Sequence, residues 1–291
     1  MERESSIKVG YWRRFTRFLL KSILFNVLSV GPVPNHIAFI MDGNRRYAKK
    51  RNLPVGEGHQ AGFISLARIL GYCYELGVKY ATVYAFSIDN FKRPANEVQV
   101  LMDLVLEKID ELLKKESIVT QYGIRLYFIG NLKLLSDNVR EAAEKAMKVT
   151  AKNDRLVLFV CIAYTSTDEI VHAVEEACKD KLDHSQAVEQ TNGSTNHWDQ
   201  ISQEDPEHDA SAIKLVDVEK RMHMAIGPDP DILIRTSGET RLSNFLLHQS
   251  DKCLIYSPAA LWPEIGLWHL VWAVLSYQRI YSYFEKKRKQ I

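Results

Sequence analysis

Residues 36–50 of this 291-residue chain read HIAFIMDGNRRYAKK. The first six of them form an apolar run, which is typical of a buried strand. The run stops at Asp42-Gly43-Asn44, a turn signal, and a cluster of basic residues follows at once. Such a turn can place a carboxylate, backbone N–H groups and guanidinium groups around one point. That combination suits a magnesium-bound diphosphate, because the carboxylate holds the cation and the arginines grip the phosphate oxygens.

The turn alone also fits an ordinary connection between a strand and a helix, but the longer string is far more specific. It resembles the signature of the cis-prenyltransferases, the undecaprenyl and dehydrodolichyl diphosphate synthase family. Residues 85–94 (AFSIDNFKRP) and 231–249 (DILIRTSGETRLSNFLLHQ) resemble the same family, and the likeness continues through residues 261–264 (LWPE). The resemblance runs from residue 31 to residue 285. Within the family it is closest to plant dehydrodolichyl diphosphate synthases and to the catalytic subunits of rubber cis-prenyltransferases.

The composition is that of a globular chain, with 46% hydrophobic and 25% charged residues. The net charge of +2 gives no global bias towards nucleic acid, and we expect no nucleic-acid partner. The four cysteines lie in or beside apolar stretches and form no Cys-x-x-Cys pair. We therefore expect buried free thiols in a reducing, cytosol-facing environment. They are Cys73, Cys161, Cys178 and Cys253.

Residues 1–30 form a separate N-terminal segment. Apolar residues recur there three or four apart, and basic residues crowd the positions between them, which predicts an amphipathic helix. Its uninterrupted apolar part is too short to span a bilayer, so we expect it to contact a membrane surface or a partner. The alternatives are a secretory signal peptide, for which the cleavage site is poor, and a helix packed on the protein's own core.

The remaining residues, 31–291, read as one catalytic domain in which strands alternate with helices. This alternation predicts an α/β fold with a single, mostly parallel six-stranded sheet flanked by helices. Residues 180–212 are polar and almost free of aliphatic side chains, which predicts a mobile polar loop. The expected strands are residues 36–41, 79–86, 124–129, 156–163, 231–235 and 253–256. The expected helices are residues 58–76, 97–121, 136–152 and 265–285, with one more that begins at residue 168.

Three polar residues, Asp42, Ser87 and Arg235, lie at the ends of expected strands. Ligands of parallel sheets bind at the carboxyl ends of the strands, so these distant segments are expected to meet at one edge. In the resembling family, a helix that corresponds to residues 97–121 helps to wall a hydrophobic tunnel for the growing product. The resemblance therefore implies a hydrophobic product tunnel here.

The resemblance also implies the reaction. Isopentenyl diphosphate is condensed repeatedly onto an allylic primer such as farnesyl diphosphate, with Mg2+ as cofactor. The product is a long-chain polyprenyl diphosphate for dolichol and protein glycosylation, and rubber-type cis-1,4-polyisoprene is the alternative. By the resemblance, Asp42 brings Mg2+ to the reacting diphosphate. The residues implied at the first diphosphate site are Gly43, Asn44, Arg45 and Arg46, and those at the isopentenyl diphosphate site are Arg93, Arg235, Arg241 and Ser243.

Further site residues follow from the same resemblance. Asn90 and Ser87 correspond to family residues near the proton that is removed, and with Asp42 they complete the expected catalytic group. Because an amide is a poor base, we expect Asn90 to relay the proton or to orient the substrate. The family has a histidine near the allylic site and aromatic residues against the isoprenoid chain. The corresponding residues here are His59, Tyr47 and Phe91.

The chain departs from the bacterial pattern of the family. Val55 replaces an arginine, and Arg45 replaces a glycine. The metal-binding glutamate of the bacterial pattern aligns near Cys253, so the resemblance implies that the second protein ligand for magnesium is absent here. The C-terminus reads EKKRKQI and lacks the arginine-x-glycine motif that reaches into the active site of single-subunit members. Eukaryotic members with this pattern borrow the motif from a partner related to the Nogo-B receptor. The resemblance thus implies a heteromer at the cytosolic face of the endoplasmic reticulum membrane, or at the surface of a rubber particle or lipid droplet.

Three other readings fit the sequence less well. A noncatalytic subunit of the same fold typically lacks the DGNRR segment, which is intact at residues 42–46. A nucleotide-binding module would carry a glycine-rich phosphate loop, and no such loop occurs. A trans-prenyltransferase would carry Asp-Asp-rich motifs, whereas this chain contains no Asp-Asp pair.

Overall fold

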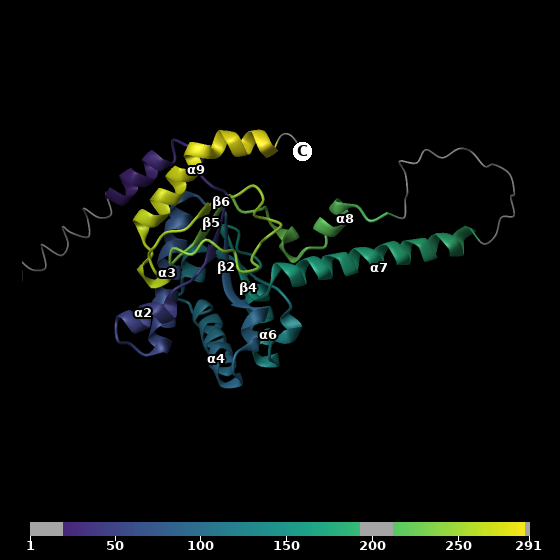
Figure 1. Cartoon of the computed structure of the whole chain (residues 1–291), viewed down its shortest axis with the longest axis horizontal. Helices are drawn as coiled ribbons and strands as arrows, with labels where there is room; N and C mark the ends of the chain where they lie inside the picture. The colour runs from purple at the N-terminus through teal and green to yellow at the C-terminus, as the bar shows by residue number, and fades with distance from the viewer. Residues whose placement is uncertain (1–19, 193–211, 289–291) are drawn as a thin grey trace, which may run out of the picture.

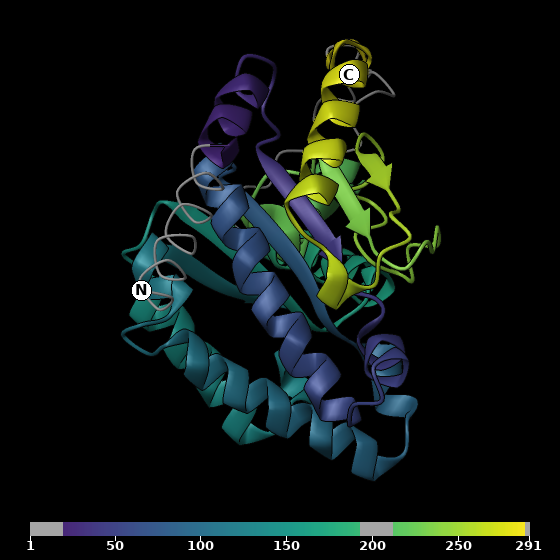
Figure 2. The same ribbon diagram turned by 90° about the vertical axis from the view of Figure 1, so that its left-hand side faces the viewer.

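The computed structural model describes residues 20–192 and 212–288. At its centre lies one sheet of six strands in the order β3-β4-β2-β1-β5-β6, with helices on its flanks (Figures 1 and 2). Every pairing is parallel, which confirms the predicted fold class. The strands are β1 (His36–Ile40), β2 (Tyr80–Ser87), β3 (Ile124–Ile129), β4 (Leu156–Tyr164), β5 (Ile232–Arg235) and β6 (Leu254–Tyr256).

Helices connect most of the strands. Helix α3 crosses in front of the sheet in Figure 2, α4 lies below the sheet in both views, and the long helix α7 projects from the body in Figure 1. The α-helices are residues 20–28, α2 (Asn44–Lys50), α3 (Val55–Leu76), α4 (Ala95–Leu112), α5 (Ile118–Tyr122), α6 (Asp137–Thr150), α7 (Ser166–Asn192), α8 (Leu215–Glu219) and α9 (Leu267–Arg288). The 3-10 helices are η1 (Ile88–Lys92), η2 (Leu132–Leu134), η3 (His223–Ile226) and η4 (Trp262–Glu264).

Strand β1 is buried along its whole length because both faces of the sheet are covered. Ile37 and Phe39 pack into the cluster that includes the long helices, whereas Ala38 and Ile40 pack into a second cluster on the other face. A strand covered on both faces needs apolar residues at every position. This explains why the sequence shows an uninterrupted apolar run and no alternation.

The order of the strands identifies the edge at which a ligand binds. From β1 the chain moves to β2 on one side, whereas β5 pairs on the other side of β1 and the chain then continues to β6. The direction of the winding therefore reverses between β1 and β5. In open parallel sheets, the carboxyl ends of the strands at such a reversal form the ligand crevice. Asp42 follows the end of β1, and Arg235 is the last residue of β5.

The helix predicted for residues 97–121 is interrupted, because α4 ends at Leu112 and α5 is a separate turn of helix. Ser117 causes the break. Its hydroxyl accepts a hydrogen bond from the backbone N–H of Thr120 (3.3 Å), which caps α5, and donates to the carbonyl of Leu112 (2.6 Å). A serine that caps a new helix competes with continuation of the old one.

Helix α7 continues through residues 180–192, where a mobile loop is predicted, so this part of the prediction is wrong. The segment is polar, but Lys, Glu, Gln, Ala and Leu are good helix formers. No glycine or proline occurs between Ser166 and Gly193, so nothing in the sequence ends the helix earlier. Residues 193–211 lie outside the described residues, and their mobility stays a prediction.

The described part of the N-terminal segment is residues 20–30, with a helix at residues 20–28 and a turn after it. Phe25 and Leu28 pack into the core, whereas Ile23 and Val27 are exposed. One face of this helix therefore packs on the protein itself, and contact with a membrane or a partner stays a prediction for the other face. None of the helices in the described parts of the chain has the length and the apolar character needed to cross a membrane.

Helix α2 carries the basic residues of the turn and packs directly on α3. Two glycines of α3 make room for it: a Cβ at Gly58 would collide with the carbonyl of Asn44, and a Cβ at Gly62 would collide with the Asn44 side chain. The indole of Trp262 also covers Gly62 and donates a hydrogen bond from Nε1 to its carbonyl (2.9 Å). The two glycines thus let Asn44 lie directly against α3.

We expect Gly62→Ala to lower the free energy of unfolding by about 1–3 kcal/mol, because the added Cβ forces apart a well-packed contact. Chemical denaturation monitored by circular dichroism measures this. Gly56→Ala in the same helix is the matched control, since a Cβ there meets nothing within 4 Å. It should be neutral or stabilising by up to about 1 kcal/mol. Equal effects of the two substitutions would contradict the packing argument.

Candidate active site

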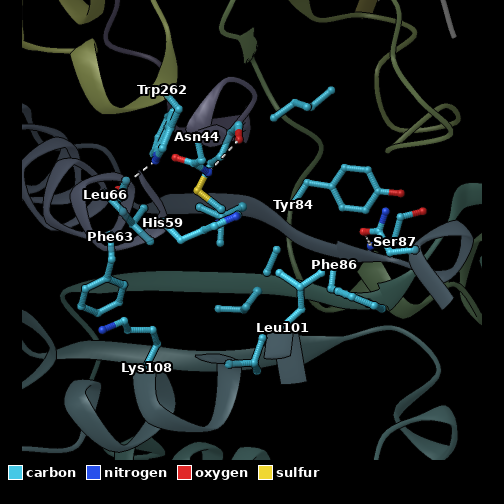
Figure 3. A pocket seen from close by; sticks show the side chains of 18 of the residues that line it. Asn44, His59, Phe63, Leu66, Tyr84, Phe86, Ser87, Leu101, Lys108 and Trp262 are labelled. Atoms are coloured by element: carbon cyan, nitrogen blue, oxygen red, sulfur yellow. Dashed lines mark hydrogen bonds between the residues drawn. The ribbon is translucent and has the colours of Figure 1, made fainter. Parts of the chain in front are cut away.

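A cavity of about 750 Å³ lies between the carboxyl ends of the strands and helices α3 and α4. Polar side chains from the ends of β1, β2 and β5 line one part of it, and apolar side chains from the two helices and the sheet line the rest (Figure 3). The predicted site residues that line it are Asp42, Asn44, His59, Ser87, Asn90, Arg93, Arg235 and Ser243. The others, Gly43, Arg45, Arg46, Tyr47, Phe91 and Arg241, lie outside the lining.

An ion pair joins Asp42 to Arg235 at the centre of the polar part. The pairing of β1 with β5 sets Arg235 beside Ile40, two residues before Asp42. Oδ2 of Asp42 accepts a hydrogen bond from Nη2 of Arg235 (3.0 Å), and Oδ1 accepts one from Nη2 of Arg46 (3.1 Å). The Arg235 side chain is only 5% exposed, whereas that of Arg46 is 49% exposed. The Arg235 pair is therefore part of the framework, and the Arg46 pair lies at the surface.

The guanidinium of Arg235 is held on several sides. Its Nη1 donates to the hydroxyl of Ser243 (2.6 Å) and to the carbonyl of Arg241. Within the described residues, two buried side-chain atoms at the cavity lack a hydrogen-bond partner, Nε of Arg235 and Oδ1 of Asn44. A fixed, buried cation with a spare donor is suited to an anionic ligand such as a diphosphate.

The backbone of Asp42 is fixed as firmly as its side chain. Its carbonyl accepts hydrogen bonds from the hydroxyls of Thr236 (2.6 Å) and Ser237 (2.8 Å) and from the backbone N–H of Trp262 (3.0 Å). Gly43 follows with φ +116°, and a Cβ at this position would lie 2.6 Å from the Ser237 hydroxyl. Glycine is needed here for both reasons. The turn therefore presents the carboxylate in one direction.

Glu239 organises the basic residues at the rim. Arg46 contacts it at 3.5 Å, and Arg241 pairs with it while its own side chain stays 62% exposed. Only the backbone of Arg241 contacts Arg235. In this structure Arg241 thus lies at the rim of the cavity, and its predicted role in binding isopentenyl diphosphate stays a prediction.

The loop after β5 is strained. Ser237, Ser243, Asn244 and Leu246 all have positive φ angles between 47° and 77°, which non-glycine residues rarely adopt. Such strain persists only where surrounding contacts hold the backbone, and it concentrates at functional sites. Tyr84 of β2 is one such contact: its ring stacks on Phe245 of this loop, with centroids 4.4 Å apart, and its hydroxyl donates to the carbonyl of Tyr164 (3.1 Å).

Ser87 and Asn90 form the turn that follows β2. The Asn90 side-chain oxygen accepts a hydrogen bond from the backbone N–H of Ser87 (3.0 Å), and the Ser87 hydroxyl accepts one from the N–H of Asp89 (3.2 Å). These bonds make a capping box at the start of η1. Both residues therefore have a structural role, which fixes their side chains at the cavity.

His59 of α3 lies near two arginines, Arg93 in the cavity lining and Arg45 outside it. Burial is the main cause that lowers its pKa, and the charges of Arg45 and Arg93 lower it further. Glu97 pairs with Arg93 at 2.8 Å and with Arg45 at 3.7 Å, so the two arginines are held together. His59 is therefore neutral at pH 7, and the region keeps its positive charge on the arginines.

The two predicted aromatic residues pack on the protein. Phe91 packs edge-on against Phe86, with ring centroids 4.9 Å apart, and Phe86 lines the cavity. Tyr47 lies under the guanidinium of Arg51 at 5.6 Å. Their predicted contact with an isoprenoid chain stays a prediction.

A magnesium ion fits the donors at this site. Asp42 presents a partly exposed carboxylate to the cavity. In the described parts of the chain, no three His, Cys, Asp or Glu side chains gather that could hold a metal by themselves. Mg2+ typically binds one or two carboxylates, and substrate phosphates and water complete its shell. Asp42 together with a bound diphosphate is such a set.

The sequence did not single out several residues that build the site. Thr236 and Ser237 anchor the Asp42 backbone, Glu239 pairs with the rim arginines, and Tyr84 supports the strained loop. The hydroxyl and carboxylate residues lie in the polar turn between the two predicted arginines, so their placement beside Arg235 was a readable signal. Tyr84 lies inside an expected strand and gave no such signal.

The comparisons with known proteins agree with this geometry. The sequence model of the family described as "Putative undecaprenyl diphosphate synthase" matches residues 40–285. The chain is 57% identical to a dehydrodolichyl diphosphate synthase of Solanum lycopersicum and 52% identical to a rubber cis-polyprenyltransferase of Hevea brasiliensis, in each case over the whole length of both chains. It is also 40% identical to a human protein named as a subunit of the dehydrodolichyl diphosphate synthase complex, over 97% of this chain and 75% of the human one.

A solved structure shows the same fold. The lavandulyl diphosphate synthase of Lavandula x intermedia, in complex with dimethylallyl diphosphate, superposes with a TM-score of 0.69 at 30% identity. The match covers 84% of this chain and 95% of that one. The chain therefore belongs to the cis-prenyltransferase family and is a transferase of prenyl groups.

We expect NMR titration to give His59 a pKa below 6.5. Arg45→Gln should raise this pKa, but not above 6.5, because burial is the larger cause. The unfolded chain then binds the proton more readily than the folded one, so His59 lowers the stability as the pH falls below 6.5. Glu57→Gln is the control, because it removes a negative charge two residues from His59 on α3, and it should not raise the pKa of His59. A pKa above 6.5 in the parent protein would show that His59 is not buried beside these cations.

Proposed function

We propose that this chain makes long-chain polyprenyl diphosphate, the precursor of dolichol for protein glycosylation, by adding isopentenyl diphosphate to an allylic primer such as farnesyl diphosphate. One observation carries the proposal: a single cavity joins the ion pair between Asp42 and the buried Arg235 to an apolar wall from α3 and α4. Each substrate has a charged head and an apolar chain, and the cavity offers both kinds of surface. The dehydrodolichyl diphosphate synthase that is 57% identical over the whole chain supports the product class.

Separate groups of residues are assigned to bind the two substrates. Asn44, with the arginines of α2, is assigned to the allylic diphosphate, and Arg235 with Ser243 is assigned to isopentenyl diphosphate. Two diphosphates held side by side bring the reacting carbons together, which supplies much of the rate. Fixed donors also stabilise the charge that builds up on the leaving diphosphate. Asn90, held by Ser87, orients the group from which the proton leaves.

Magnesium belongs to this proposal as the cation that family members generally use. Asp42 would hold it beside a diphosphate, where it would neutralise charge on the phosphate oxygens. Arg46 can release the Asp42 carboxylate when the cation binds, because the pair of Arg46 with Asp42 is exposed. Arg235 stays in place, since its guanidinium is buried and bonded to Ser243.

Rubber-type polyisoprene is the second candidate product. The rubber cis-polyprenyltransferase of Hevea brasiliensis, 52% identical over the whole chain, favours it. Both products form by the same reaction from the same kinds of diphosphate substrate, and they differ in the number of isopentenyl diphosphate units that are added. Sizing the product therefore separates the two candidates.

We further propose a partner subunit related to the Nogo-B receptor and a location at the cytosolic face of the endoplasmic reticulum membrane. The relative named as a subunit of a synthase complex supports an assembly. Single-subunit members of the family are expected to use an arginine-x-glycine element at the active site, and eukaryotic members are expected to borrow it from such a partner. A partner that supplies this element would add donors to the diphosphates.

Incorporation of radiolabelled isopentenyl diphosphate tests these proposals. We expect little product from the chain alone and full activity after the partner is added.

In the complete system, Asp42→Asn should reduce turnover by about 100-fold or more, because a charge at the diphosphate is lost. Asp103→Asn is the matched control, since its carboxylate is exposed on α4 and contacts Gln99. Near-normal turnover of folded Asp42→Asn would refute the assignment, and full activity without a partner would refute the heteromer.

A further inference from the structure

The first turn of α7 holds the loop after β5, which comprises residues 236–253. The backbone N–H of Ser166 donates to the carbonyl of Asn244 (2.8 Å), and the N–H of Thr167 donates to the Asn244 side-chain oxygen (3.1 Å). In return, the hydroxyl of Ser166 accepts a hydrogen bond from the backbone N–H of Leu247 (2.9 Å). The first N–H groups of a helix have no partner within that helix. Asn244 therefore caps α7 from a loop that lies 77 residues later in the chain.

The side chains of Asn244 and Thr167 also bind each other. Nδ2 of Asn244 donates to the hydroxyl of Thr167 (3.0 Å), and this hydroxyl lies 3.1 Å from Oδ1 of Asn244. Both ends of the amide are thus engaged by one residue of the helix. Asn244 lines the cavity, whereas Thr167 lies outside its lining. The pair therefore connects the wall of the cavity to a residue that no substrate in the cavity touches.

The backbone that this pair holds is strained. Ser243 and Asn244 have φ angles of +51° and +58°, which non-glycine residues rarely adopt. Such a conformation persists only where the surrounding contacts fix it. The hydroxyl of Ser243 accepts a hydrogen bond from Nη1 of Arg235 (2.6 Å). The strained backbone therefore sets the place of a hydroxyl that contacts the buried guanidinium.

We propose that Asn244 and Thr167 are positioning residues for isopentenyl diphosphate, because their mutual bonds keep Ser243 on Arg235. The inference rests on the proposed function, which assigns Arg235 and Ser243 to this substrate. Without the pair, the strained backbone relaxes and the Ser243 hydroxyl leaves Arg235. The substrate must then order the loop when it binds, and this ordering weakens its binding. Helix α2 carries the groups assigned to the allylic diphosphate and takes no part in these bonds, so binding of the allylic primer should change little.

Asn244→Gly and Thr167→Val break the pair from opposite sides. Glycine adopts a positive φ without strain, so the first variant removes the side-chain bonds and adds no strain. Valine keeps the shape of threonine but lacks its hydroxyl. With the partner present, we expect either variant to raise the KM for isopentenyl diphosphate by about tenfold, since hydrogen bonds that hold the site are lost. The KM for farnesyl diphosphate should stay within about twofold of the parent value.

Two further variants separate positioning from direct contact with the substrate. Thr167→Ser keeps the hydroxyl and should give the parent KM. The double variant Thr167→Val/Asn244→Gly should raise the KM for isopentenyl diphosphate no further than the larger single effect, because both substitutions break the same bonds. Additive effects would show that the two residues act separately and would overturn the proposal. Thr167 is exposed, so Thr167→Val also tests the proposal if Asn244→Gly does not fold.

Asn153→Ala is the matched control. The Asn153 amide also holds a distant backbone group, the carbonyl of Ile124 (2.8 Å), and it lies outside the cavity lining. This variant should be less stable to denaturant but should keep the parent KM for isopentenyl diphosphate. An equal rise of this KM in Asn153→Ala would show a general effect of lost stability and would overturn the positioning role. An unchanged KM in folded Asn244→Gly and Thr167→Val would also overturn it.

Hydrogen exchange distinguishes failure of this inference from failure of the proposed function. We expect faster exchange of the amides of Thr167 and Leu247 in Asn244→Gly than in the parent protein. Unchanged exchange would overturn the clamp whether or not the protein turns over. Absence of any isopentenyl diphosphate incorporation by the parent chain with its partner would instead refute the proposed function.

Discussion

The ion pair between Asp42 and Arg235 joins the ends of two neighbouring parallel strands. Arg235 is almost completely buried, and burying a guanidinium costs free energy unless acceptors surround it. Asp42, Ser243 and the backbone of Arg241 provide the acceptors. These acceptors come from separate turns, so one cation fixes the end of β1 relative to the loop after β5. The requirement to satisfy this cation thus positions the polar part of the cavity.

The same constraint explains which parts of the site are rigid and which can respond to a ligand. The carbonyl of Asp42 is held by three donors, and Gly43 allows the close approach of Ser237. The exposed arginines at the rim, Arg46 and Arg241, share Glu239 and are free to exchange this partner for a phosphate. Exposed pairs of this kind contribute little to stability. A preorganised centre with an adaptable rim is therefore suited to substrates whose chain grows at every cycle.

Much of the fold could be predicted from the sequence because strong local patterns determine it. The apolar runs gave the strands, and the alternation with helices gave a parallel sheet. Asp42 and Arg235 lie at strand ends, so their meeting followed from general rules for parallel sheets. The apolar pattern of residues 97–121 continues across the cap at Ser117, so the pattern predicts one helix where two occur. The polar composition of residues 180–192 predicts a loop, but their helix propensity prevails and α7 continues to Asn192. Long-range contacts, such as the stacking of Tyr84 on Phe245 in the strained loop, leave no local pattern in the sequence.

The affinity for isopentenyl diphosphate of an Arg235→Lys variant tests the account most directly. Lysine keeps the charge but lacks the planar fork that reaches Asp42 and Ser243 together. Isothermal titration of isopentenyl diphosphate into the assembled protein, in a buffer that contains Mg2+, measures the dissociation constant. Circular dichroism shows whether the variant is folded. A charge-assisted hydrogen bond contributes about 1.5–3 kcal/mol, so we expect the variant to bind roughly 10- to 100-fold more weakly. A folded Arg235→Lys protein that binds isopentenyl diphosphate as tightly as the parent would contradict the central role of this guanidinium.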